Sequence, residues 1–422
     1  MEMAKYLIIG AGVSGLAFAN AIHSDDYLIL EKEAKPGGYC RTERRGEYVW
    51  DYAGHFFHFS HPELKARFEK TIPEDAMVLR KKNTKIFYKG NYVDYPFQKN
   101  IHQLSKKEMI DCLYDLFERT EKPQYDHFLE MLYGKFGKSI TEKFLRPYNE
   151  KLYACSLQEL DVDAMGRFFP YADTKEIIRN MKNRDDTSYN QFFSYPKQGA
   201  AVFVEKLLEG VENCRLHMNE KAIKIDLGKK ILETDKNVYS YDYLISSAPL
   251  NEFADISDLS FLLNKNDLSY NQVLVLNLGF DKPSKDRSIH WIYVPSKEIN
   301  FYRAGFYSNI IGTEKLSMYI EIGYPKNYTI LQTEKDYQLA ETLKNLKMMK
   351  IIDDHRLVDY QALVMNPAYV HITEKGKKTV QQLKEQLKEK GVYLTGRYGS
   401  WKYCSIEDCM IDAFHIAEEI DG

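Results

Sequence analysis

Hydrophobic positions near the start of the chain predict a strand, a helix and a second strand in quick succession. Residues 6–9 form one apolar run, and residues 27–30 form another that ends at Glu31. Between them the glycine pattern G-x-G-x-x-G occupies residues 10–15, and apolar residues follow it at helical spacing. This order is typical of the βαβ unit that binds the pyrophosphate of a dinucleotide.

Each glycine of this pattern, and the acidic residue that follows it, has a physical task. Gly10 allows the tight turn, Gly12 lets the backbone approach a pyrophosphate, and Gly15 lets the helix pack on the strand. The free N–H groups at the start of the helix favour the phosphates. Glu31 lies about 20 residues on and can accept hydrogen bonds from ribose hydroxyls. The pattern therefore predicts a dinucleotide without saying which one.

The hydrophobic pattern changes along the rest of the chain. From about residue 101 to residue 181, apolar residues recur three and four positions apart, which predicts a helical insertion. From about residue 272 to residue 324 the pattern is typical of strands in an antiparallel sheet. Residues 392–420 then repeat the order of strand, glycine turn and amphipathic helix. We therefore expect the end of the chain to rejoin the dinucleotide domain.

Two turns near the first unit carry candidate chemistry. The glycine-rich loop at residues 36–38, with Arg41 after it, suits a second approach to a pyrophosphate. The small-residue turn at residues 51–55 ends in His55, which could lie close to a ring system. A single histidine is more often structural, so both interpretations of His55 stay open.

Composition excludes some classes of function. The 422 residues carry a net charge of −3, so no overall field favours nucleic acid or a membrane surface. The six cysteines include no C-x-x-C pair, so we expect no metal site and reduced thiols in the cytoplasm. Residues 5–22 superficially resemble a signal peptide, but cleavage would destroy the nucleotide site, and no run is apolar enough to span a bilayer.

Taken together, the motifs resemble a family of FAD proteins that includes amine oxidases, protoporphyrinogen oxidase and UDP-galactopyranose mutase. The central motifs are similar to the mutase branch in its eukaryotic-like form. The segments that carry the resemblance are GAGVSGLAFA (10–19), PGGYCRT (36–42), FLRPYNEKLYA (144–154), HWIYVPSKEINFYRAGFYSN (290–309) and GRYGSWKY (396–403).

The resemblance implies an α/β fold with a Rossmann-like FAD-binding domain, a helical insertion domain and an antiparallel β-sheet substrate domain. We expect an FAD-binding domain made of residues 1–98, 191–270 and 351–422, a helical domain over residues 99–190, and the sheet over residues 271–350. The implied reaction interconverts UDP-galactopyranose and UDP-galactofuranose, or a related nucleotide sugar. In it, N5 of reduced FAD is the nucleophile at the anomeric carbon, and NAD(P)H is a candidate reductant.

The resemblance also implies roles for individual residues. Arg303 and Arg167 match arginines that bind the pyrophosphate, a task for which the guanidinium fork is well suited. Such arginines would stabilise the charge that develops on departing UDP. The implied catalytic residues are Arg303, Arg167 and His55. The implied substrate-binding residues are Asn149, Tyr153, Tyr293, Arg303, Arg167, Tyr369 and Tyr403. The implied FAD-binding residues are Gly10, Gly12, Val13, Ser14, Gly15, Glu31, Lys32, Gly38, Tyr39, Arg41, Gly54, His55, Gly396, Arg397, Ser405 and Ile406.

Three positions depart from the family pattern. Tyr153 stands where the family usually has tryptophan, so an aromatic wall is kept. Ile310 replaces a tyrosine that binds phosphate, and Glu407 replaces an asparagine near the sugar or phosphate. A carboxylate beside a diphosphate is repulsive unless it is protonated, paired or turned away.

Two other functions remain open on the sequence. One is an oxidoreductase of the same FAD superfamily, such as an amine oxidase or a desaturase. The other is a non-catalytic FAD-binding protein, favoured only by the departures at Ile310 and Glu407. An arginine pair placed for a diphosphate distinguishes the mutase, because an amine oxidase has no use for it.

Overall fold

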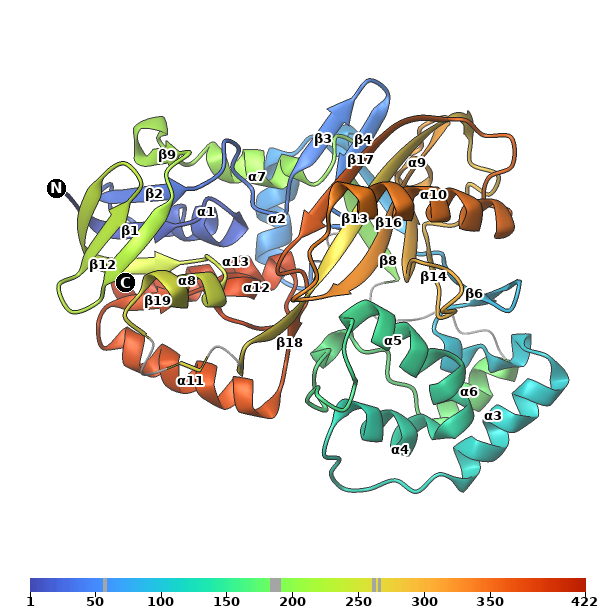
Figure 1. Ribbon diagram of the computed structural model, residues 1–422. Coiled ribbons are helices and arrows are strands. Elements are labelled where there is room, and N and C mark those ends of the chain that lie inside the picture. Colours follow the sequence, from blue (N-terminus) through green and yellow to red (C-terminus); the bar gives the residue numbers. More distant parts are fainter. Residues whose placement is uncertain (56–58, 183–190, 260–262, 265–266) are drawn as a thin grey trace.

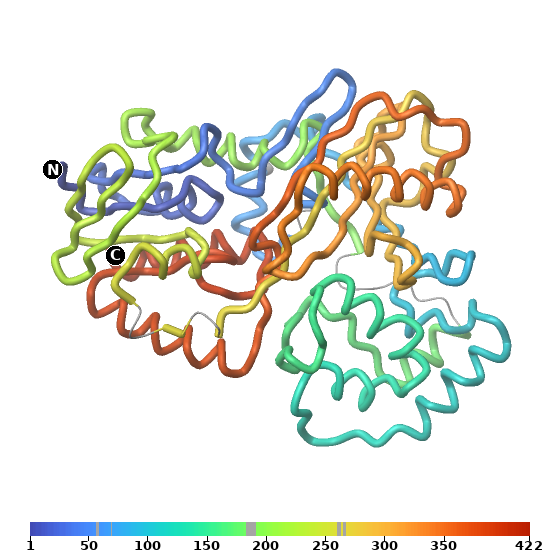
Figure 2. The backbone as a smooth tube through the Cα atoms, viewed as in Figure 1, coloured from blue at the N-terminus to red at the C-terminus, as the bar shows by residue number. Residues whose placement is uncertain are grey.

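The computed structural model describes residues 1–55, 59–182, 191–259, 263–264 and 267–422 (Figures 1 and 2). A seven-stranded sheet carries the N-terminal glycine turn. Its strand order is β10-β11-β12-β1-β2-β9, with β19 also paired to β12. The strands are β1 (Glu2–Ile9), β2 (Tyr27–Glu31), β9 (Leu216–Met218), β10 (Ala222–Asp226), β11 (Ile231–Thr234), β12 (Val238–Ser246) and β19 (Val392–Leu394). Strands β1, β2, β9, β12 and β19 run parallel.

Helices cover both faces of this sheet because alternate residues of β1 face opposite sides. Tyr6 and Ile8 pack with α1 (Val13–Ala19), α7 (Ala201–Leu208) and α13 (Ile406–Asp421) in one core cluster. Leu7 and Ile9 pack in another cluster on the opposite face. The helices on that face are α8 (Leu250–Ile256) and α11 (Glu374–Lys388).

Segments from distant parts of the chain build this one unit. In Figure 1 the lobe on the left combines the blue start of the chain, a yellow-green middle segment and the red end. Strand β19 pairs with β12, and α13 packs against α1. The C-terminal strand, turn and helix thus join the unit that carries the N-terminal glycine turn.

A second sheet of eight strands has the order β17-β13-β16-β15-β14-β6-β7, with β18 paired to β13. Its strands are β6 (Thr84–Tyr88), β7 (Asn91–Asp94), β13 (Ser269–Pro283), β14 (Trp291–Tyr293), β15 (Arg303–Phe306), β16 (Lys315–Pro325), β17 (Leu357–Met365) and β18 (Val370–His371). All its pairings are antiparallel except β14 with β6. The predicted span of 271–350 is therefore narrower than the observed sheet, because a local pattern predicts strands but not their partners.

The predicted helical stretch forms a lobe below the second sheet, shown in teal in Figure 1. It contains α3 (Lys106–Glu118), α4 (Phe128–Ile140), α5 (Arg146–Tyr153) and α6 (Thr174–Lys182), with a π-helical turn, η4 (Thr141–Leu145), between α4 and α5. Tyr148 and Tyr153 of α5 belong to the same core cluster as Tyr302 and Tyr319. The junction between the helical lobe and the second sheet is thus built largely of tyrosine.

Smaller elements complete the description. There are two further two-stranded antiparallel sheets. One is the hairpin of β3 (Thr42–Arg45) with β4 (Tyr48–Asp51), and the other pairs β5 (Met77–Lys81) with the distant β8 (Phe192–Pro196). The remaining helices are α2 (Pro62–Thr71), α9 (Tyr307–Ile311), α10 (Gln332–Met348), α12 (Gly396–Gly399), η1 (Glu74–Ala76), η2 (Phe97–Lys99), η3 (Ile101–Gln103), η5 (Gly166–Phe168) and η6 (Asn213–Arg215). Among the residues that the structure describes, every helix is too short or too polar to cross a lipid bilayer.

Candidate functional site

The N-terminal glycine turn has the geometry expected of a pyrophosphate site. A Cβ atom on Gly15 would lie 2.0 Å from the carbonyl oxygen of Gly10, so the helix can approach the strand only because residue 15 lacks a side chain. At Gly12, by contrast, the nearest atoms to such a Cβ are 4.0 Å away, and φ is an ordinary −78°. Packing therefore requires glycine at position 15 but not at position 12, where close approach of a ligand would require it.

Glu31 lies at the end of β2 and is held against this turn. Its carboxylate accepts a hydrogen bond of 2.8 Å from the backbone N–H of Ala11 and one of 2.9 Å from that of Glu33. A carboxylate has about four acceptor positions, so Glu31 keeps capacity for ribose hydroxyls. Lys32, also predicted to bind the cofactor, instead pairs with Glu252 on the surface at 2.9 Å.

The second glycine loop lies directly on the first. The N–H of Gly37 donates to the carbonyl of Ala11 at 2.8 Å, and Gly12 and Gly37 form a parallel bridge. A Cβ on Gly38 would lie 3.6 Å from the Cα of Gly12. The two glycine-rich loops thus form one surface, and its contact with a pyrophosphate stays a prediction.

Two side chains predicted beside this loop have partners within the protein. The Nε of Arg41 donates to the carbonyl of Pro36 at 3.3 Å, so its guanidinium curls back over the loop. The hydroxyl of Tyr39 accepts the N–H of Asn366 at 2.8 Å, and burial raises the pKa of Tyr39 above its ordinary value. Both residues shape the loop, and their contact with a cofactor stays a prediction.

The C-terminal glycine turn also meets the start of α1. A Cβ on Gly396 would lie 2.4 Å from the Oγ of Ser14, which follows Val13 at the first turn of that helix. Arg397 is held by its Nε, which donates to the carbonyl of Cys404 at 3.0 Å. Ser405 then caps α13, which begins at Ile406. The predicted cofactor residues from both ends of the chain therefore come together.

His55 follows Gly54 in a turn that the buried side chain of Tyr307 holds in place. The hydroxyl of Tyr307 donates to the carbonyl oxygens of Asp51 and Ala53, at 3.2 and 3.3 Å. The Nδ1 atom of His55 is buried and has no hydrogen-bond partner in the part of the chain that the structure describes. Burial, with added repulsion from Arg397 and Arg303, lowers the pKa of His55 to about 4. At neutral pH the ring is uncharged, and its buried nitrogen suits a polar group of a ligand.

Acidification should destabilise the protein through three such histidines. Burial lowers the pKa of His55, His290 and His371 from 6.5 to about 4, so the unfolded chain binds more protons between these values. Their contribution is present above pH 6.5 and is lost as the pH falls towards 4. Asp51, whose pKa burial raises to about 6, acts in the opposite direction. We expect Tm, measured by circular dichroism, to fall by about 5–10 °C between pH 7 and pH 5.

The control for this prediction is the exposed His23, which pairs only at the surface. His23→Gln should leave the slope of Tm against pH unchanged, whereas His371→Gln should make it shallower. A Tm that is the same at pH 7 and pH 5 would contradict the assignment.

Arg303 lies at the start of β15, opposite Glu321 of β16 and Tyr293 of β14. Its Nε and Nη2 atoms form a two-pronged ion pair with Glu321, at 2.9 and 2.6 Å. The side chain of Arg303 is 19% exposed, and that of Glu321 is 1% exposed. Nη2 also lies 3.4 Å from the hydroxyl of Tyr369. A nearly buried cation thus lies beside the hydroxyl of Tyr369.

The tyrosines predicted to bind the substrate lie around the two arginines Arg303 and Arg397. The rings of Tyr369 and Tyr403 stack with centroids 6.0 Å apart, and Tyr153 meets Tyr369 edge-on at 6.1 Å. The guanidinium of Arg397 lies 5.1 Å from the centre of the Tyr403 ring. We call Arg303, Arg397 and the four tyrosines 153, 293, 369 and 403 the tyrosine–arginine cluster.

Two buried oxygens at the base of the cluster lack partners. In the described residues, neither the Oδ1 atom of Asn149 nor the hydroxyl of Tyr153 has a hydrogen-bond partner. Both residues lie on α5, and the Nδ2 atom of Asn149 donates to the carbonyl of Leu145 at 2.6 Å. Buried polar atoms are usually satisfied, so these groups suit a polar ligand or water.

Arg167 lies apart from the centre, at its rim. Its Nη2 atom pairs with Asp408 of α13 at 2.8 Å, and its side chain is 43% exposed. The guanidinium stands 5.2 Å from the ring of Phe168, which meets Tyr403 edge-on at 5.3 Å. The two predicted phosphate arginines thus differ, since Arg303 is enclosed and Arg167 bridges the helical lobe and α13.

The structure accounts for the two departures that seemed unfavourable. The carboxylate of Glu407 is 3% exposed and accepts hydrogen bonds from the backbone N–H groups of Ser60 and His61, at 2.9 Å each. It is therefore paired, as a carboxylate near a diphosphate must be. Ile310 is fully buried in α9 and belongs to the core. No structural partner for a phosphate is expected from its side chain.

Sequence reasoning missed Glu321 and the supporting residues Tyr302 and Phe168. The hydroxyl of Tyr302 donates to Glu321 at 2.5 Å, so that carboxylate is held from two sides. One signal was available: Glu321 is the single charge within an otherwise apolar strand pattern, MYIEIGY. A buried charge of this kind nearly always has a partner.

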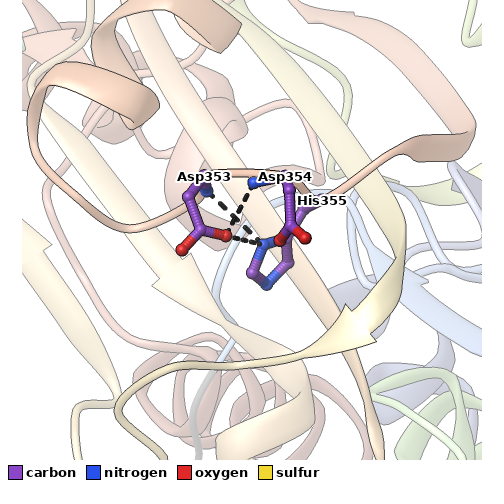
Figure 3. A group of neighbouring side chains, drawn as sticks. All are labelled: Asp353, Asp354 and His355. Atoms are coloured by element: carbon purple, nitrogen blue, oxygen red, sulfur yellow. Dashed lines mark hydrogen bonds and ion pairs between the residues drawn. The ribbon is translucent and has the colours of Figure 1, made fainter.

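Three neighbouring side chains outside the cluster are of types that can bind a metal ion. Asp353, Asp354 and His355 bring their ligand atoms within 4.8 Å of one another (Figure 3). Lys285 pairs with Asp353 at 2.5 Å, and Lys282 pairs with Asp354. The Nε2 atom of His355 is 2.9 Å from the carbonyl of Pro283. These partners explain the cluster without a metal ion.

Two surface hollows lie outside the tyrosine–arginine cluster. One, of about 340 Å³, lies between α3 and α4. The other, of about 510 Å³, lies between the β6–β7 turn, α5 and residues 295–298. Charged side chains line both hollows, and their lining includes none of the predicted site residues.

Comparison with known proteins places this geometry in context. A family model described as flavin containing amine oxidoreductase matches residues 13–421. A protoporphyrinogen oxidase of Dictyostelium discoideum is 27% identical over 225 residues, which are 42% of this chain and 42% of that protein. The chain thus matches less than half the length of this curated relative.

Solved structures share the whole architecture. The crystal structure of a reduced UDP-galactopyranose mutase covers 100% of this chain and 94% of its own, with a TM-score of 0.91 and 22% identity. The structure of a proposed protoporphyrinogen oxidase from Exiguobacterium sp. 255-15 covers 100% of this chain and 98% of its own, with a TM-score of 0.78 and 17% identity. At these identities the likeness shows the fold, and the predicted fold class is confirmed.

Proposed function

Because this chain belongs to the family of flavin containing amine oxidoreductases, we propose that it is a flavin-dependent isomerase of nucleotide sugars. Its reaction would interconvert UDP-galactopyranose and UDP-galactofuranose, or a closely related pair. The observation that carries this proposal is the enclosed guanidinium of Arg303, which lies among tyrosines. A diphosphate needs such a cation, whereas an apolar or amine substrate does not.

The residues present fit FAD. Gly12, Gly15 and Gly38 form the bare surface for a pyrophosphate, and Glu31 is fixed for a ribose. The unpartnered Nδ1 atom of His55 suits a polar edge of the ring system, in the described part of the chain. When bound, FAD would supply a reducible ring whose N5, in the reduced state, is a nucleophile.

Arg303 would bind the diphosphate and stabilise the charge that develops on UDP as it departs. Glu321 binds one N–H of Nε and one of Nη2 in the guanidinium of Arg303, so the remaining N–H groups, two on Nη1 and one on Nη2, keep one orientation. Arg167 lies at the rim, where it would bind the same diphosphate from the other side once released from Asp408. Arg303 would thus bind the diphosphate inside the site, and Arg167 would contact it at the entrance.

The tyrosines would form the walls of the sugar site. Tyr369 and Tyr403 present stacked rings, and Tyr153 closes one end with a buried hydroxyl. Flat rings with hydroxyl groups bind sugars and exclude water, which would protect an activated sugar from hydrolysis. Asn149 would offer its Oδ1 atom to the nucleotide part of the substrate.

A second candidate is an oxidoreductase like protoporphyrinogen oxidase, which the curated relative favours. Such an enzyme removes hydride from an organic substrate and leaves peroxide or another reduced acceptor. An ion pair whose arginine is 19% exposed and whose glutamate is 1% exposed is a poor wall for an apolar ring substrate. The mutase reaction is therefore the better match to the site.

Activity of the reduced protein tests the proposal. The purified flavoprotein should be reduced with dithionite and given UDP-galactofuranose, with UDP-galactopyranose followed by chromatography. We expect conversion by the reduced protein and none by the oxidised protein, because only reduced N5 is nucleophilic. Substituting NADPH for dithionite tests the candidate reductant. Oxidation of an amine or a porphyrinogen with peroxide formation, and no isomerisation, would refute the proposal.

A further inference from the structure

Two cysteines meet at the start of α13. The Sγ atoms of Cys404 and Cys409 are 3.6 Å apart, which is van der Waals contact. Cys404 precedes the cap residue Ser405, and Cys409 lies one turn into the helix. Their exposed fractions are 4% and 9%, so both thiols are buried. A modest rotation of the side chains would bring the two sulfur atoms to bonding distance.

This pair lies directly behind the cofactor-facing turn. Arg397 donates from its Nε to the carbonyl of Cys404 at 3.0 Å, and its guanidinium stands over Tyr403. Arg397 also contributes to the lowered pKa of His55. Arg397, a predicted FAD-binding residue, therefore joins the thiol pair to the C-terminal glycine turn.

The electrostatic environment favours one thiolate. The S–H of Cys404 stabilises ionised Cys409 and lowers the pKa of Cys409, and Arg397 acts in the same direction. A cysteine near a cation and a helix N-terminus is the reactive kind, whereas a cysteine buried among apolar groups is inert. Cys112, in α3, is of the inert kind, because burial raises its pKa to about 12.

We propose that Cys404 and Cys409 form a redox-active dithiol that exchanges an electron pair with the bound flavin. In this step both S–H bonds break and one S–S bond forms. Two electrons and two protons leave the thiols, and oxidised flavin is the acceptor of both electrons and of at least one proton, the other passing to solvent. The inference rests on FAD binding and not on the identity of the sugar.

The exchange has a use in the proposed reaction. An isomerisation has no net redox change, so an electron pair delivered once would serve many turnovers. The dithiol would hold a reserve pair that restores the reduced flavin after an oxidation. If the two cysteines only pack against each other at the helix start, no such reserve exists, and the experiment below separates the two cases.

An anaerobic titration of the air-oxidised holoprotein tests the proposal. Dithionite is added in steps, and flavin absorbance near 450 nm is followed to completion. We expect the wild-type protein to take up about four electrons per flavin, two for the flavin and two for the disulfide. Cys404→Ala and Cys409→Ala should take up about two. Cys112→Ala is the matched control for loss of a buried thiol and should behave as the wild type.

Thiol labelling gives a readout that needs neither a variant nor catalysis. The oxidised holoprotein is unfolded in N-ethylmaleimide, and labelled cysteines are identified by mass spectrometry, before and after dithionite. We expect Cys404 and Cys409 to be the two unlabelled positions before reduction, and to be labelled after it. Uptake of only about two electrons by the wild type, with all six cysteines labelled, would overturn the proposal. Failure of the isomerase assay alone would leave it standing.

Discussion

Replacing Arg303 with alanine should lower kcat/KM for the nucleotide sugar by about 10²- to 10³-fold, the usual cost of removing one group that stabilises developing charge. Two effects act together here. The diphosphate loses its enclosed cation, and Glu321, at 1% exposure, is left as an unpaired negative charge beside it. The kcat/KM of Arg303→Lys should lie between those of the wild type and Arg303→Ala, because lysine keeps the positive charge but not the guanidinium fork.

Arg303→Ala should also lower the stability of the folded protein, so the experiment needs a matched variant. Breaking a buried ion pair on one side costs about 3–5 kcal/mol, whereas replacing both partners with apolar residues is often neutral. The double variant Arg303→Met with Glu321→Leu should therefore recover Tm without recovering activity. Binding of UDP, measured by calorimetry, separates the roles. Unchanged UDP affinity in the folded double variant would show that the substrate site lies elsewhere.

Gly12→Ala should give a folded protein that has lost its flavin. In the protein itself a methyl group at position 12 has no atom nearer than 4.0 Å, and φ is −78°, so neither crowding nor strain arises. The same methyl group would meet the pyrophosphate that this glycine is expected to admit. We expect the dissociation constant for FAD to rise by about 100-fold, equivalent to about 3 kcal/mol, while the Tm of the flavin-free protein stays unchanged.

Gly15→Ala is the informative contrast. Its methyl group would lie 2.0 Å from the carbonyl oxygen of Gly10, so the strand and helix must separate and the Tm of the flavin-free protein should fall. Gly228→Ala, with its nearest contact at an ordinary 3.5 Å, controls for the substitution itself. If Gly12→Ala retains yellow colour after dialysis, the glycine turn does not contact the cofactor as we infer.

The sequence was sufficient for features that depend on neighbouring residues. The glycine turn, the acid at the end of β2 and the helical stretch are all local patterns, and the structure contains each of them. The return of the C-terminus was also predictable, because residues 392–420 repeat the same local order of elements. The resemblance at family level was carried by such motifs, and the family match and the fold agree with it.

Features that depend on distant partners were not predictable in this way. Glu321 faces Arg303 only because β15 and β16 pair in one particular register. The contact of Arg167 with Asp408 joins residues on two different lobes, and β6 with β7 extends a sheet whose other strands come much later in the chain. In each case the energy comes from tertiary pairing, which leaves no periodic signal. The roles of the cluster residues in binding and catalysis stay predictions.

The contact between Gly396 and Ser14 has a consequence for the biosynthesis of the protein. The N-terminal part of the predicted cofactor site leaves the ribosome early, whereas Gly396 is translated much later. At ordinary elongation rates the interval is on the order of tens of seconds. During that time β1 lacks α13, which covers one face of its sheet, so the nascent chain exposes apolar surface that is buried only once α13 has been made. We therefore expect stable flavin binding only after α13 has been made, and chaperones that hold nascent chains should influence the yield of yellow protein more than its final stability.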